Sequence, residues 1–171
     1  HKGVDVALLA ARQLRARIPT LGLVVGGSGP VGGWLAEAAA SLPWVHRPGA
    51  VHGADKARWL AAADVMVNPG QVGLGVFDGF AAGLPLVTCR DMPHSPEVAY
   101  LGHEVNALLV APGPDAVARA VQGLLDDPAG RQRLGRGALD SASRHTLDRM
   151  VSQFVAGVAM WQASAPRRSG A

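Results

Sequence analysis

Residues 64–88, which read DVMVNPGQVGLGVFDGFAAGLPLVT, restrict the fold of this chain more than any other stretch. The apolar run Val65–Val67 predicts a short buried strand, which Pro69–Gly70 ends. The glycines of Gly73–Gly75 open a helix that runs to a stop at Gly83–Pro85, and a second apolar strand follows. A strand, a glycine-rich turn, a helix and a further strand indicate an α/β fold with parallel strands.

The glycine-rich turn has the character of an anion site. Its backbone N–H groups and the positive end of the helix dipole would point out of the carboxyl end of the sheet, which favours a bound phosphate. Asp78 lies one turn inside the helix and supplies an acceptor for a ribose hydroxyl, so a nucleotide is the expected ligand. Glycines that only let a helix pack close to a strand would explain such a unit about equally well.

The whole segment resembles the donor-binding segment of the retaining glycosyltransferases of family 4, which have the two-domain GT-B fold. Most members have Pro-Ser-x-x-Glu-Gly-Phe-Gly, a second Glu eight residues after the first, and then Ala-x-Ala-x-Gly-x-Pro-Val-Val. Aligned on Ala81–Pro85, the second acid falls on Asp78 and the first on Gly70, so the acid that contacts the sugar in the family is absent. A branch of the family has Pro-Gly-x-Val-Gly-Leu followed by His-x-Pro-Glu, which this chain matches at Pro69–Leu74 and His94–Glu97.

The resemblance assigns further residues to the donor site. Lys2 matches a lysine that grips the donor pyrophosphate together with a loop arginine, although an exposed N-terminal lysine is the simpler reading without the resemblance. Gly27 belongs to a turn that lines the crevice, and Val51 belongs to a turn whose main chain meets the nucleotide base. The residues whose amides are expected to stabilise the departing diphosphate are Val72, Gly73, Leu74 and Gly75.

The loop after the strand Leu86–Thr88 carries the candidate catalytic residues. It leaves the carboxyl end of the strand, where ligands of open parallel sheets bind, and Pro93 and Pro96 stiffen it. His94 and Glu97 are therefore expected near the sugar, where they would replace the missing acid. An equally good alternative places Glu97 in the first turn of a short helix, where its charge complements the helix dipole.

The remainder of the chain continues the alternation of strands and helices. It predicts a Rossmann-like parallel sheet with helices on both faces, which the resemblance makes one half of a GT-B architecture. We expect a single domain over residues 1–162 and a flexible tail over 163–171, with a first strand and an N-terminal domain outside this sequence. The last helix, Thr146–Trp161, is expected to be incompletely buried, because the family's last helices cross back towards the first domain.

Three local features are also predicted. Val31–Leu42 forms a helix with Trp34 facing inward. Asp55 caps a helix over residues 56–63, and Asp115 caps the helix that follows it.

Composition limits the function classes. With 171 residues, 49% of them hydrophobic, the chain suits one well-buried domain. The net charge of +3 is modest and the basic residues are scattered along helices, so no nucleic acid partner is expected. The single cysteine, Cys89, excludes an internal disulfide and a Cys-rich metal site, and favours a reducing, cytoplasmic compartment. No apolar run approaches the roughly 20 residues of a membrane span.

The resemblance implies sugar transfer from a nucleotide diphosphate sugar, with retention of configuration and without a metal or cofactor. The implied partners are that nucleotide sugar and the N-terminal domain of the same enzyme, and peripheral membrane association through the full-length protein stays open. The acceptor is not determined. Because the crevice needs a second wall, we expect the chain alone to bind a nucleoside diphosphate without turnover.

Two alternatives come from other functional classes. A dinucleotide-dependent oxidoreductase would need a Gly-x-Gly-x-x-Gly turn and an acid about 20 residues later, at the end of the second strand. Trp44–Arg47, where that acid would lie, contains no acidic residue. A glycosyltransferase-like module that binds without catalysis is the second alternative, and the missing acid at Gly70 is its best support.

Overall fold

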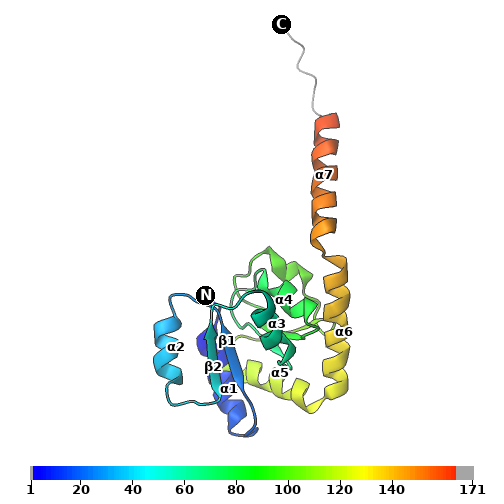
Figure 1. The fold of residues 1–171 in the computed structure, drawn as a ribbon. Helices are drawn as coiled ribbons and strands as arrows, with labels where there is room; N and C mark the ends of the chain where they lie inside the picture. The colour runs from blue at the N-terminus through cyan, green and yellow to red at the C-terminus, as the bar shows by residue number, and fades with distance from the viewer. Residues whose placement is uncertain (1, 165–171) are drawn as a thin grey trace.

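The computed structural model describes residues 2–164. Helices and strands alternate along most of the chain, and Figure 1 shows their arrangement. In chain order the elements are α1 (Val4–Arg15), β1 (Leu23–Gly26), α2 (Gly32–Ala39), β2 (Val45–Gly49), α3 (Gly53–Ala61), β3 (Met66–Val67), α4 (Gly75–Ala81), β4 (Leu86–Cys89), the 3-10 helix η1 (Pro96–Tyr100), β5 (Ala107–Val110), α5 (Pro114–Asp126), α6 (Pro128–Arg144) and α7 (Leu147–Ser164).

All strand pairs in the described residues are parallel, which confirms the predicted α/β class. The strands form two sheets, with β1 beside β2 in one and the order β3-β4-β5 in the other. Leu86 of β4 lies opposite Met66 of β3 and Ala107 of β5. The sequence predicts one sheet. The structure differs because, within the described residues, neither β1 nor β2 forms a ladder with a strand of the β3-β4-β5 sheet.

Helices cover both faces of β4, as predicted. Side chains alternate between the faces of a strand, and Val87 and Cys89 pack into a core formed with α1, α5 and α6. Leu86 packs instead against Phe80 of α4 and Ala138 of α6. Every residue of β4 is buried, so this strand is the centre of the fold.

The local predictions need three corrections. Trp34 is 46% exposed, and α2 buries Leu35 and Ala39 instead. Asp55 does not cap α3, because the helix already begins at Gly53, and its carboxylate accepts a hydrogen bond from Arg58 at 2.8 Å. Asp115 lies one residue inside α5, because Pro114 takes the first helical position that proline favours.

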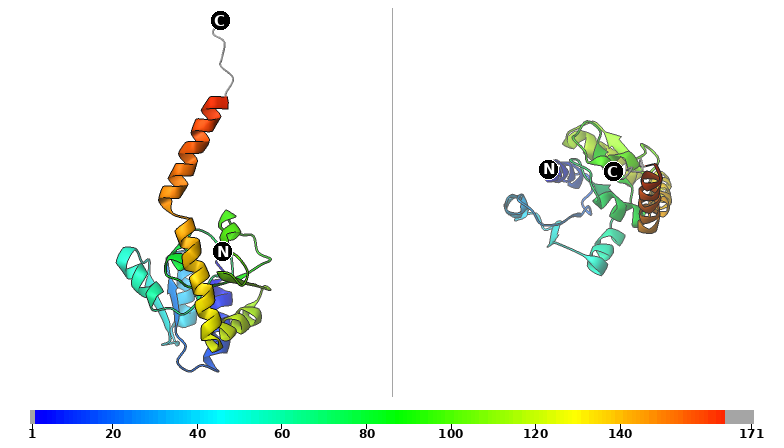
Figure 2. Two further views of the ribbon diagram at one scale, coloured as in Figure 1. Left: turned by 90° about the vertical axis from the view of Figure 1, so that its right-hand side faces the viewer. Right: turned by 90° about the horizontal axis from the view of Figure 1, so that it is seen from above.

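The last helix, α7, stands apart from the rest of the molecule (Figures 1 and 2). Each of its residues is exposed, which confirms the expectation that the last helix is incompletely buried here. The helix extends through Ser164, two residues into the predicted tail, and residues 165–171 of that tail lie outside the described residues. Among residues 2–164, no helix is long and apolar enough to cross a membrane. The large exposed apolar side chains of α7 are Leu147, Met150, Val151, Phe154, Val155, Val158, Met160 and Trp161.

Candidate functional site

The chain segment that enters α1 lies against the glycine-rich turn. Gly70 N–H donates to the carbonyl of Lys2 at 3.2 Å. Gly3 has a φ of +66°, and a Cβ at this position would lie only 2.7 Å from the Gly70 nitrogen. Only glycine fits both the left-handed backbone and this close approach. The resulting contact places Lys2 next to the turn, although 67 residues separate Gly3 from Gly70 in sequence.

Lys2 lies beside the turn residues with which it is predicted to act. Its Nζ donates to the carbonyl of Gln71 at 2.9 Å, and it is 3.2 Å from where a Cβ of Gly73 would be. The side chain is exposed, yet it crosses to the turn and contacts it. The ammonium charge of Lys2 therefore lies beside the amides that follow Val72. It strengthens the attraction of this turn for an anion.

Three of the four predicted amide donors have no partner in the part of the chain that the structure describes. Within the described residues, the amides of Gly73, Leu74 and Gly75 make no hydrogen bond, and α4 begins at Gly75. Leu74 has a side chain that is 73% exposed, so this part of the turn faces solvent. Val72 differs, because it is fully buried and its N–H donates to Nδ1 of His94 at 3.2 Å.

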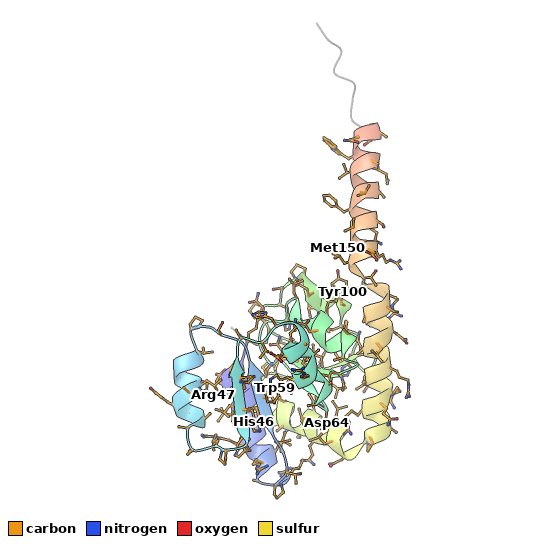
Figure 3. All side chains as sticks on the ribbon, in the orientation of Figure 1. His46, Arg47, Trp59, Asp64, Tyr100 and Met150 are labelled. Carbon is orange, nitrogen blue, oxygen red and sulfur yellow. The ribbon has the colours of Figure 1, made fainter. Side chains whose placement is uncertain are left out.

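Asp78 forms an ion pair that the sequence did not predict. Its Oδ1 lies 2.7 Å from Nζ of Lys56, and both side chains are 40% exposed. Lys56 belongs to α3, which is anchored to β2 by the stacking of Trp59 on His46, labelled in Figure 3, with ring centroids 6.2 Å apart. Lys2 and Lys56 are the only two lysines in the sequence, and this scarcity is the one signal that could have pointed to Lys56.

His94 and Glu97 lie in the loop that leaves β4, but their environments differ. Both ring nitrogens of His94 are engaged, Nδ1 by Val72 and Nε2 by the carbonyl of Cys89 at 2.7 Å. Glu97 lies in the first turn of η1, which is the position that the alternative interpretation predicts. Its Oε2 is buried and has no hydrogen-bond partner within the described residues.

Gly27 and Val51 lie together at the carboxyl ends of β1 and β2. Gly27 N–H donates to the carbonyl of Gly49 at 2.7 Å, and its φ of +127° is one that glycine adopts readily. A Cγ atom of Val51 lies 3.3 Å from where a Cβ of Gly26 would be. Among residues 2–164, no hydrogen bond joins Gly27 or Val51 to Lys2, whereas α3, which follows Val51, reaches Asp78 through Lys56.

Residues 2–164 contain no cluster of three or more His, Cys, Asp or Glu side chains that could hold a metal. Burial raises the pKa of the Cys89 thiol, which therefore stays protonated at neutral pH. The chemistry available at this site is hydrogen bonding and charge from the turn amides, two lysines and two carboxylates.

Sequence comparison identifies the family of the chain and curated relatives. The sequence model of the family described as "Glycosyl transferases group 1" matches residues 1–127. A glycogen synthase of Mycobacterium tuberculosis (strain CDC 1551 / Oshkosh) is 33% identical over 149 residues, which cover 81% of this chain and 34% of the relative. The same values hold for the glycogen synthase of strain H37Rv. The chain thus spans about a third of the length of these curated relatives.

Solved structures share the fold at low sequence identity. Anabaena Alr3699/HepE, solved in complex with UDP and glucose, has a TM-score of 0.74 at 18% identity, with 93% of this chain and 45% of that chain covered. TarM of S. aureus has a TM-score of 0.78 at 14% identity, with 90% and 32% covered. The C-terminal domain of LpcC, a glycosyl transferase group 1 family protein of Francisella tularensis, has a TM-score of 0.67 at 18% identity, with 84% and 78% covered.

Proposed function

The chain belongs to the group 1 glycosyl transferases, and on that premise we propose that it forms the donor-binding domain of a GT-B enzyme. The reaction is transfer of a sugar from a nucleotide diphosphate sugar, with retention of configuration and without a metal. The sugar and UDP named with the Anabaena structure, and the glycogen synthase relatives, make a hexosyl nucleotide the first donor to test.

The observation that carries this proposal is a group of three amides, Gly73–Gly75, that make no hydrogen bond within residues 2–164 and lie beside the ammonium of Lys2. Negative charge develops on the diphosphate as it leaves the sugar, and donors fixed at that point stabilise the transition state more than the ground state. Asp78 supplies an ionised acceptor for a ribose hydroxyl, and Gly27 and Val51 line the side of the base.

The sugar needs a holding group, because Gly70 takes the position that the family resemblance gives to the acid that contacts the sugar. Glu97 is the group that we propose, since its Oε2 lacks a hydrogen-bond partner among the described residues and a shift of the side chain on donor binding would bring this buried oxygen to a sugar hydroxyl. His94 is the weaker candidate, because both of its ring nitrogens already make hydrogen bonds.

The rest of the enzyme completes the site in this proposal. An N-terminal domain would close the crevice over the donor, bind the acceptor, and cover the exposed apolar residues of α7. We therefore expect the 171-residue chain alone to bind nucleoside diphosphates without transferring sugar. A cytoplasmic location, close to the supply of nucleotide sugars, belongs to the same proposal.

Calorimetric titration with UDP, GDP and ADP tests the proposed function and selects the base. Saturable binding of at least one diphosphate is expected, and it should weaken in Asp78→Ala. The matched control is Asp126→Ala, which removes an exposed aspartate at the end of α5 whose carboxylate accepts hydrogen bonds from Gln122. Failure of all three diphosphates to bind would refute the proposal.

A binding module without catalysis is the second candidate, and it rests on the glycine at position 70. Both candidates predict binding of the diphosphate, so binding alone does not separate them. Release of free sugar or its transfer from the bound nucleotide sugar by the complete polypeptide would exclude the non-catalytic module.

A further inference from the structure

The hydrogen bonds of His94 indicate which tautomer its neutral ring adopts. Val72 N–H donates to Nδ1 at 3.2 Å, so Nδ1 carries no proton. A neutral imidazole then has its proton on Nε2, and this nitrogen lies 2.7 Å from the carbonyl oxygen of Cys89, to which it donates. His94 therefore joins the backbone just before the free turn amides to the end of β4 through one defined tautomer.

Neighbouring contacts reinforce this link. Ser95 N–H donates to the carbonyl of Val72 at 3.2 Å. The side-chain amide of Gln71 donates to the hydroxyl of Ser95 at 2.9 Å. The backbone at positions 71–72 is thus held by two consecutive residues of the loop that leaves β4.

Burial makes the ring of His94 difficult to replace by water. Val72 is fully buried, so loss of the imidazole would leave a backbone donor without a partner. The turn could satisfy that donor only by shifting, and a shift at Val72 would displace Gly73 and the amides that follow it.

We propose that His94 is a positioning residue that acts through Val72: its Nε2-protonated imidazole holds the turn so that the amides of Gly73–Gly75 face the diphosphate. This inference rests on the proposed function, because it assumes that those amides bind the donor. It also removes His94 from the catalytic residues, because neither ring nitrogen is left to exchange a proton with the substrate.

Two partial substitutes for the imidazole test the inference. His94→Asn keeps an acceptor near the position of Nδ1 and loses the donor to Cys89. His94→Gln reaches the position of Nε2, where it can donate to Cys89, but it leaves Val72 without its acceptor. One lost hydrogen bond corresponds to about a two- to tenfold change in an equilibrium. We expect His94→Gln to weaken UDP binding by that factor, and His94→Asn to stay within about twofold of the unmodified protein.

His103→Gln is the matched control, because Nδ1 of His103 also accepts a backbone N–H, that of Leu109 at 3.1 Å. It should leave the affinity for UDP unchanged. If the Gln and Asn variants of His94 bind UDP equally well, or the control loses as much affinity as His94→Gln, the positioning role is wrong.

Nitrogen-15 NMR of the imidazole provides a second readout that does not depend on any variant folding. The spectrum should show a protonated Nε2 and an unprotonated Nδ1 for His94, and a proton on Nδ1 would overturn the inference. If the unmodified protein binds none of the diphosphates, the proposed function fails and the positioning role fails with it. If it binds UDP and His94→Gln binds equally well, only the positioning role fails.

Discussion

Lys56 Nζ lies 2.7 Å from Asp78 Oδ1 and joins α3 to the first turn of α4. The pair connects the two parts of the site, because α3 follows the Val51 turn and α4 follows the glycine-rich turn. Both side chains are 40% exposed, and exposed ion pairs contribute only about 0–1 kcal/mol to stability. The pair therefore matters for the position of the Asp78 carboxylate more than for the stability of the fold.

Asp78→Ala should weaken binding of a nucleoside diphosphate by about ten- to a hundredfold, because a hydrogen bond to a charged group is worth about 1.5–3 kcal/mol. The free energy of unfolding should change by less than about 1 kcal/mol, since only an exposed ion pair is lost. Calorimetry and urea denaturation measure the two quantities. Equal affinities in variant and unmodified protein would make Asp78 a surface residue of α4.

Lys56→Met should weaken binding of the same ligand by about two- to fivefold, because it frees the Asp78 carboxylate to move. The effect should vanish in the Asp78→Ala background, where Lys56 has no carboxylate to hold. A double-mutant cycle with the two substitutions measures this coupling. Additive losses would mean that Lys56 contacts the ligand directly.

Gly3→Ala should destabilise the protein by about 1–3 kcal/mol, because alanine would be strained at positive φ and its Cβ would lie 2.7 Å from the Gly70 nitrogen. It should also weaken diphosphate binding, since Lys2 would move away from the turn. Gly123→Ala is the control. It lies in α5 with no atom within 4 Å of a new Cβ, so it should stabilise by about 0.5–1 kcal/mol. Denaturant titrations that rank the two variants the other way would contradict the assigned backbone.

Glu97→Gln in the complete enzyme should reduce turnover of the nucleotide sugar far more than it weakens binding of the bare nucleoside diphosphate. A misplacement of the sugar by about 1 Å can cost on the order of a hundredfold in rate. Comparing kcat with the dissociation constant of UDP separates the two effects. Parallel losses would assign Glu97 to the support of η1 or of the turn.

Backbone amides of residues 151–161 should exchange rapidly with deuterium in the isolated chain, because this part of α7 is exposed on all sides. The same amides should become protected in the complete polypeptide if an N-terminal domain covers them. Hydrogen exchange followed by mass spectrometry detects the difference. Slow exchange in the isolated chain would show that α7 packs elsewhere.

The sequence predicted the central elements because their signals are local. The apolar run before Pro69, the glycines that open α4 and the stop at Gly83–Pro85 are all read within a few neighbouring residues. The contact between Lys2 and the turn was reached only through the family resemblance, since 69 residues separate Lys2 from Gln71.

The missed features arise from side chains that meet across elements. Lys56 and Asp78 are 22 residues apart, as are Val72 and His94, and neither pair follows a helical or strand period. The place of His94 in a polar loop predicts a catalytic role, and no local pattern indicates that the buried N–H of Val72 donates to its ring. The division into two sheets was also missed, because strand periodicity does not report which edges pair.

The connection between α6 and α7 is short, and α7 extends away from it over its whole length. Helix α6 is fixed in the core by Leu134 and Ala138, and the ring of Tyr100 lies 4.5 Å from that of His145 at this connection. At 1.5 Å per residue, the 18 residues of α7 are about 27 Å long. A rotation of about 10° at His145 would therefore displace the far end of α7 by about 5 Å, so a small change in the contact between Tyr100 and His145 corresponds to a large displacement at the other end of the helix.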